Sequence, residues 1–179
     1  MYKILIVDDE SIEREGISFL IEKYKLPLEV AQATNGKTAL EYMRTHPIDI
    51  LLTDVKMPQM DGLELARHTF EKYPDVRILV FSAYGEFEFA KKAMAAQAVS
   101  YLLKPIEVDE FQRVMAQILA RCDELAEKKK DEQQRGEEYR QQLLFRLVTG
   151  TGLGKAHITE EWFSGQTLCL LHVKTENDY

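Results

Sequence analysis

The sequence predicts an α/β domain in which a doubly wound sheet of five parallel strands carries helices on both faces. The first observation is that short apolar runs rich in β-branched or large aliphatic residues recur along the chain, at residues 3–7, 28–33, 48–53, 76–81 and 100–103. The second is that segments with helical spacing separate these runs, and that Pro47, Pro74 and the Asn35-Gly36 pair punctuate the joints. Strands that alternate with helices in this way form parallel sheets.

The predicted helices lie between and after these strands. Apolar residues three or four apart favour helices over residues 12–21, 39–43, 63–70 and 90–94. A longer seam follows the last strand from Val108 onward, with apolar members at Phe111, Met115, Ile118, Cys122 and Leu125. Packing on the sheet explains the first half of this seam. Contact with a second copy of the chain is an open alternative for its second half.

The remainder of the chain predicts two further parts after a first domain over residues 1–125. Residues 126–148 form a charged helical linker that can dimerise, in which lysines 128–130 lie among acids and indicate a solvated helix face. Residues 149–179 contain one further strand pattern, at 167–173, and roughly thirty residues cannot build a core of their own. We therefore expect the start of an incomplete second domain, with the nature of the end at Tyr179 left open.

Composition limits the classes of function. The formal net charge of −7 argues against a domain that mainly wraps nucleic acid, because phosphate contacts need a clustered basic surface. The amino terminus has too short an apolar run for a signal peptide or a membrane span. Cys122 and Cys169 lie far apart without metal-ligand spacing, which indicates free thiols in a reducing compartment. We expect a cytoplasmic protein that does not contact a membrane.

Three acids follow two of the predicted strands. Asp8 and Asp9 come after the first strand and Asp54 comes after the third, so the carboxyl edge of the sheet should bring them together. Like charges at such distances recruit a cation, and hard oxygen ligands without histidine or cysteine suit Mg²⁺. Taken alone, Asp8 or Asp9 could equally be a helix N-cap.

Two more polar residues follow the remaining core strands. Ser82 comes after the fourth strand, and Lys104 comes after the fifth, directly before Pro105. A lone lysine is usually a surface residue, but an ammonium at this edge can neutralise the carboxylates and bind a phosphoryl oxygen. Four strand ends therefore direct polar groups to one place.

With their neighbours these residues form a combined motif. Its members are Asp8-Asp9, Asp54, Met57-Pro58, Asp61-Gly62, Ser82-Ala83, Tyr101 and Lys104-Pro105. The set resembles the receiver domain of response regulators in bacterial two-component systems, over about residues 1–125. The resemblance implies a flavodoxin-like sheet with strand order 2-1-3-4-5, followed here by the C-terminal helical extension.

The resemblance also implies the chemistry of the acids. Asp54 would accept a phosphoryl group from a sensor histidine kinase. Asp8 and Asp9 would bind Mg²⁺ together with the Asp54 carboxylate and the backbone carbonyl of Lys56. The chain would assist its own phosphorylation and dephosphorylation, and would not be an enzyme acting on other molecules.

Lys104, Ser82 and Tyr101 take the remaining implied roles. Lys104 would contact the phosphate, Ser82 would turn to donate a hydrogen bond to it, and Tyr101 would turn inward as a switch. The peptide bond before Pro105 is commonly cis in the family. The switch would change the surface or the dimer state, with a homodimer forming through the face of the fourth and fifth helices or through the linker helix.

The extension resembles that of long AraC-type (YesN-like) response regulators, on the strength of Tyr84-Gly85-Glu86-Phe87, the stretch at 143–150 and the strand after it. Transcriptional control would then be the output, through a DNA-binding domain that these residues do not contain. The main alternative is a receiver-like module that is never phosphorylated and acts by binding or dimerisation. An aspartyl phosphatase is disfavoured because it expects an acid where Lys56 stands, and a flavin site because Asp8-Asp9-Glu10 would repel phosphate.

Overall fold

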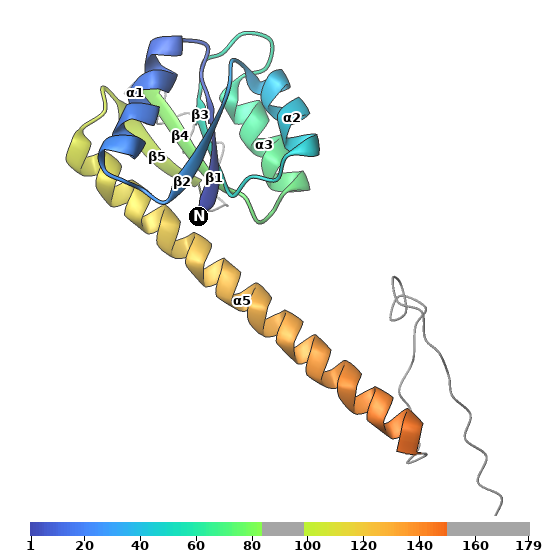
Figure 1. The fold of residues 1–179 in the computed structure, drawn as a ribbon. Helices are drawn as coiled ribbons and strands as arrows, with labels where there is room; N and C mark the ends of the chain where they lie inside the picture. Colours follow the sequence, from blue (N-terminus) through green and yellow to red (C-terminus); the bar gives the residue numbers. More distant parts are fainter. Residues whose placement is uncertain (84–98, 150–179) are drawn as a thin grey trace, which may run out of the picture. The chain divides into compact units, whose positions relative to one another are not determined.

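The computed structural model describes residues 1–83 and 99–149, and within them five parallel strands form one sheet in the order β2-β1-β3-β4-β5 (Figure 1). The predicted fold class and strand order are confirmed. The strands are β1 (Tyr2–Val7), β2 (Leu28–Ala33), β3 (Ile50–Asp54), β4 (Arg77–Ala83) and β5 (Val99–Lys104). All of them point the same way, so their carboxyl ends share one edge of the sheet.

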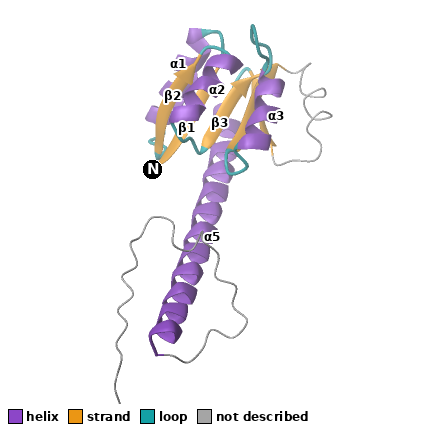
Figure 2. Ribbon diagram, turned by 90° about the vertical axis from the view of Figure 1, so that its right-hand side faces the viewer, coloured by secondary structure: helices purple, strands orange, loops and turns teal. Residues whose placement is uncertain are grey.

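Helices pack on both faces of this sheet, as Figure 2 shows. They are α1 (Ser11–Lys23), α2 (Gly36–Thr45), α3 (Gly62–Lys72) and α5 (Val108–Thr149). Buried residues of α1 and α5 share one hydrophobic cluster, and those of α2 and α3 share the other. The helix predicted at 90–94 lies outside the described residues. No helix in the described ranges combines the length and hydrophobicity needed to cross a membrane.

The strand alternation assigns each apolar residue to a face. Ile4 and Ile6 belong to the cluster under α1 and α5, whereas Leu5 and Val7 belong to the cluster under α2 and α3. All four are fully buried, which explains why the strand reads as a continuous apolar run rather than as an alternating one. The sheet therefore lies between two hydrophobic cores and contributes buried side chains to both.

The strands end later than the apolar pattern predicts. Asp54 is the last residue of β3, Ser82 lies inside β4, and Lys104 is the last residue of β5, so none of the three follows its strand. The cause is backbone pairing: Asp54 is the partner of Phe81 in the ladder, and Lys104 is the partner of Ala83. A polar residue can continue a ladder because its main chain pairs like any other, which an apolar pattern does not reveal.

The first half of the α5 seam packs on its own sheet, as predicted. Phe111, Met115, Ile118 and Cys122 all lie in the cluster shared with α1. Cys122 is a buried free thiol, and burial is the main cause that raises its pKa to about 11. Lys129 and its lysine neighbours are exposed, as predicted.

The chain divides into two units, residues 1–130 and residues 131–179. In the first unit, Lys129 of α5 forms an ion pair of 2.8 Å with Asp75 on the loop before β4. In the second unit, the described residues continue α5 to Thr149, with Leu143 buried and Phe145 exposed. The strand predicted at 167–173 and the second cysteine lie outside the described residues. The predicted boundaries at 125 and 148 stay predictions.

A capping box begins α2. The Asn35 side chain accepts a hydrogen bond of 2.9 Å from the backbone N–H of Thr38, and the Thr38 hydroxyl accepts one from the backbone N–H of Asn35. Replacing Asn35 with alanine is expected to lower the free energy of unfolding by about 1 kcal/mol, because the backbone N–H of Thr38 loses its side-chain acceptor. Lys37→Ala, at an exposed position of the same helix, should change it by less than about 0.5 kcal/mol. Urea unfolding followed by circular dichroism measures both, and equal effects would contradict the cap.

Candidate functional site

Three carboxylates meet at the carboxyl edge of the sheet. Asp8 and Asp9 directly follow β1, Asp54 ends β3, and their oxygen atoms lie within 4.8 Å of one another. Adjacent parallel strands cause this, since Val7 of β1 is the ladder partner of Thr53 in β3 and the next residues are therefore level. Asp8 and Asp54 are buried, whereas Asp9 is exposed. We expected these three residues to converge, and the structure brings them together.

Neither Asp8 nor Asp9 caps the helix that follows. The N-cap of α1 is Glu10, whose side chain makes no capping hydrogen bond. Asp8 instead accepts a hydrogen bond of 2.8 Å from the backbone N–H of Glu10, and Arg14 donates to the Asp8 carbonyl oxygen. The N-cap alternative is therefore wrong. The turn between β1 and α1 holds the Asp8 carboxylate inward, toward the sheet edge.

One ammonium reaches two of the three acids. The Lys104 Nζ atom lies 3.0 Å from Asp8 Oδ2 and 3.1 Å from Asp54 Oδ1. Burial acts to lower the pKa of Lys104, but its hydrogen bonds to Asp8 and Asp54 outweigh burial and raise that pKa. The lysine therefore stays charged at neutral pH, and within the part of the chain that the structure describes its ammonium pairs with two of the three carboxylates.

Burial dominates the electrostatics of Asp54. Desolvation raises the pKa of its carboxyl group, and the neighbouring Lys104 offsets part of that rise. The second carboxylate oxygen accepts a hydrogen bond of 3.1 Å from the backbone N–H of Lys56. The two oxygens of Asp54 thus differ, because one faces an ammonium and the other faces the loop after β3.

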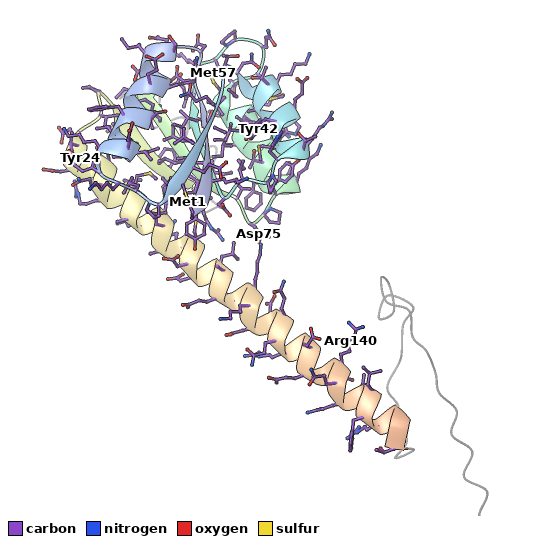
Figure 3. All side chains as sticks on the ribbon, in the orientation of Figure 1. Met1, Tyr24, Tyr42, Met57, Asp75 and Arg140 are labelled. Atoms are coloured by element: carbon purple, nitrogen blue, oxygen red, sulfur yellow. The ribbon has the colours of Figure 1, made fainter. Side chains whose placement is uncertain are left out.

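The loop between β3 and α3 folds tightly back on Asp54. The Gly62 N–H donates a hydrogen bond of 2.9 Å to the Val55 carbonyl oxygen, and a Cβ atom on Gly62 would lie 1.7 Å from the Asp54 carbonyl oxygen. Asp61 caps α3 by accepting from the Glu64 N–H. Beside the acids this loop lines a pocket of about 370 Å³, whose residues are Asp9, Val55, Lys56, Met57, Pro58, Asp61 and Leu63. Figure 3 shows Met57 at the end of the domain opposite Met1 and Asp75.

Ser82 and Tyr101 occupy different surroundings. The Ser82 side chain is buried in β4, and its hydroxyl donates to the Ala83 carbonyl oxygen at 3.4 Å. Tyr101 packs against the cluster under α2 and α3, on the face of the sheet away from α5, and burial raises its pKa. The Lys104–Pro105 peptide bond is cis, as the resemblance implied. The structure thus gathers Asp8, Asp9, Asp54 and Lys104, and it places Tyr101 on the other face.

Sequence reasoning missed one residue of the site. The Lys104 Nζ atom lies 4.5 Å from the centre of the Phe81 ring. Phe81 stands in an apolar strand and reads as an ordinary core residue. Its position two residues before the end of β4 gives no signal of a charged neighbour, since that neighbour comes from another strand.

The sequence matches the response regulator receiver domain family over residues 4–116. The chain belongs to this family. The carboxylates and the lysine described above all lie within the matched range, and the described part of the fold is the one the resemblance implied.

Two of the relatives of this chain are transcriptional regulators by name. This chain is 41% identical over 121 residues to the uncharacterised transcriptional regulatory protein YesN of Bacillus subtilis strain 168, and the match covers 67% of this chain and 33% of YesN. It is 31% identical over 118 residues to the transcriptional regulatory protein DegU of Brevibacillus brevis, covering 64% of this chain and 50% of DegU. The chain thus spans between a third and a half of the length of these relatives.

Solved structures give the same fold. A two-component transcriptional regulator AraC from Clostridium phytofermentans ISDg has a TM-score of 0.65 at 35% identity, covering 69% of this chain and 97% of that one. The receiver domain of AraT, a response regulator from Geobacillus stearothermophilus, has a TM-score of 0.63 at 38% identity, covering 72% and 98%. The predicted likeness to AraC-type regulators is confirmed by these comparisons.

Proposed function

We propose that the receiver domain accepts a phosphoryl group on Asp54 from a sensor histidine kinase and thereby controls an output of the protein that contains it. The observation that carries this proposal is the Lys104 ammonium shared by Asp8 and Asp54, with Asp9 beside them. A buried carboxylate next to a cation, at an edge with a pocket, has both a nucleophilic oxygen and a group that stabilises the oxygens of an incoming phosphate.

The donor set at this edge fits Mg²⁺. Among the described residues the cluster offers only carboxylate oxygens, and one ammonium leaves it short of positive charge. Asp8, Asp9, the Asp54 carboxylate and the Lys56 backbone carbonyl would hold the ion. When bound, it would neutralise charge on the transferring phosphoryl oxygens.

The residues of the chain perform the transfer by position and charge. An Asp54 oxygen attacks phosphorus, the bond to the donor breaks, and an acyl phosphate forms. The Lys104 ammonium, which donates to the Asp54 carboxylate before the transfer, then donates to a phosphoryl oxygen. The Ser82 hydroxyl donates a second hydrogen bond to the phosphoryl group. The added charge of about −0.5 to −1 gives these donors stronger partners, which biases Tyr101 and the surface of β5 toward a second arrangement.

The output of the switch depends on the whole protein that contains the receiver domain. Two named relatives are transcriptional regulators of which this chain matches only a part, which supports transcriptional control through a DNA-binding domain outside these residues. We place the receiver at residues 1–125, a linker able to dimerise at 126–148 and the start of another domain at 149–179. We also propose that the protein forms a homodimer and is located in the cytoplasm.

The experiment is the intact mass after incubation with Mg²⁺ and acetyl phosphate, with elution from a size-exclusion column recorded in parallel. The wild type should gain one phosphoryl group, Asp54→Asn should gain none, and Asp75→Asn should behave as wild type because Asp75 lies at the other end of the sheet (Figure 3). Chelation of the metal should abolish the adduct. A wild type that stays unmodified would favour the module that acts by binding alone.

A further inference from the structure

The side chain of Lys104 has to extend over the neighbouring strand β4 to reach Asp8 and Asp54. It ends β5, Asp54 ends β3, and β4 lies between those two strands. The residue of β4 paired with Asp54 is Phe81, and Phe81 is in turn paired with Leu102. Alternate residues of a strand share a face, so Lys104 lies on the same face as Leu102, and therefore as Phe81 and Asp54.

The side chain that Lys104 crosses is an aromatic ring. Its ammonium lies 4.5 Å from the centre of the Phe81 ring, within the range over which the negative face of a ring attracts a cation. The ring is 1% exposed, and the lysine side chain keeps only 22% of its surface in contact with solvent. Partial desolvation strengthens such an attraction, and the packing of the ring fixes its place.

Three contacts then define the position of one ammonium. Asp8 and Asp54 hold it by hydrogen bonds, and the Phe81 ring supports it from β4. A lysine side chain has four flexible torsions, and without the ring the two acids alone would have to hold it at the edge of solvent. Restricting it in advance lowers the cost of orienting it in the transition state.

We propose that Phe81 is a positioning residue for phosphoryl transfer, whose ring holds the Lys104 ammonium at the Asp54 oxygen where the phosphoryl group arrives. This rests on the proposed function of Asp54 as the acceptor. The role belongs to the face of the ring, because an aliphatic side chain of similar size offers no negative surface to a cation.

Phe81 is also part of the core, so its volume and its ring electronics must be separated. Phe111 is a matched control, since it is a fully buried phenylalanine of the same hydrophobic cluster and lies on α5. Trifluorophenylalanine keeps the shape of the ring and weakens the negative charge of its face. Incorporated at position 81 or at position 111, it changes electronics while leaving packing nearly the same.

The first measurement is the rate of adduct formation with saturating Mg²⁺ and acetyl phosphate. The fluorinated ring at position 81 should slow it about fivefold, from the part of the cation–π attraction that the ring loses. The same residue at position 111 should leave the rate unchanged. Phe81→Leu should slow it at least as much, and Phe111→Leu should lower stability without this loss of rate. A wild-type rate with the fluorinated ring at position 81 would overturn the proposal.

The second measurement needs no phosphodonor. Ring current from Phe81 should move the ε-methylene protons of Lys104 upfield in the NMR spectrum, and Phe81→Leu should abolish that shift while Phe111→Leu keeps it. Absence of the shift in the wild type would refute the contact itself. A wild type that shows the shift but gains no phosphoryl group would instead refute the proposed function of Asp54 and, with it, the role of the ring.

Discussion

Replacing Gly62 with alanine is expected to destabilise the receiver domain by about 3 kcal/mol or more. The added Cβ atom would lie 1.7 Å from the Asp54 carbonyl oxygen and 2.8 Å from the Thr53 hydroxyl oxygen. The first of these neighbours is backbone, so no change of rotamer can relieve the clash. Either β3 or the start of α3 has to move, although β3 is paired on both sides.

A second glycine supplies the matched control. Gly16 lies in α1, and a Cβ atom there would meet nothing within 4 Å. Gly16→Ala should therefore stabilise the domain by about 0.5–1 kcal/mol, because alanine loses less backbone freedom in a helix. Urea unfolding of both variants gives the comparison, and a Gly62→Ala variant within about 1 kcal/mol of wild type would contradict the close approach.

The same substitution should also affect Asp54 directly. The atom that clashes is the carbonyl oxygen of Asp54 itself, so a shift of the end of β3 that relieves the clash displaces the carboxylate from Lys104. The fraction of Gly62→Ala that remains folded should therefore form the phosphoryl adduct more slowly than wild type. Gly16→Ala should form it at the wild-type rate.

Replacing Lys104 with methionine is expected to slow phosphorylation of Asp54 by on the order of a hundredfold, the usual cost of removing one group that stabilises transition-state charge. Methionine keeps most of the length and apolar contact of lysine but has no charge and no donor. The adduct should be followed by intact mass over time with acetyl phosphate and Mg²⁺. Lys129→Met, at an exposed ion pair with Asp75, should keep the wild-type rate.

The same variant should show a pH-dependent loss of stability in Mg²⁺-free buffer. The folded-state pKa of Asp54 is raised by burial and partly lowered again by Lys104. A raised pKa means that stability is present below the unfolded value and is lost as pH rises through the folded value. Without Lys104 the pKa rises further, so more stability is lost at neutral pH.

The expected difference from wild type is about 2 kcal/mol near pH 7, since the acids lose their cation while partly buried. It should shrink when the pH falls from neutral into the acidic range, because the Asp54 carboxyl group, whose pKa is raised by burial, takes up a proton in the variant. Urea unfolding at neutral and at acidic pH measures this change. Lys129→Met should cost less than about 1 kcal/mol at neutral pH, because that pair is solvated. A difference between Lys104→Met and wild type that grows toward low pH would contradict the assigned electrostatics.

The site was only partly open to prediction. The placement of Asp8, Asp54 and Lys104 after apolar runs was enough to expect them at one edge, because parallel strands carry their carboxyl ends to the same side. Whether Asp8 capped α1 depended on the turn geometry, and the helix in fact starts after Glu10 without a side-chain cap. The roles of Ser82 and Tyr101 rest on the resemblance and stay predictions.

The sequence by itself determined how strands and helices alternate along the described part of the chain and at which end of the sheet the acids gather, because periodicity and strand polarity are properties of neighbouring residues along the chain. Only the tertiary structure decided that Lys104 passes over the ring of Phe81 and that Gly62 lies against the Asp54 carbonyl. Both contacts join residues from different elements. Their distances depend on strand register and on how closely a loop returns to the sheet, and no local pattern of residues encodes either quantity.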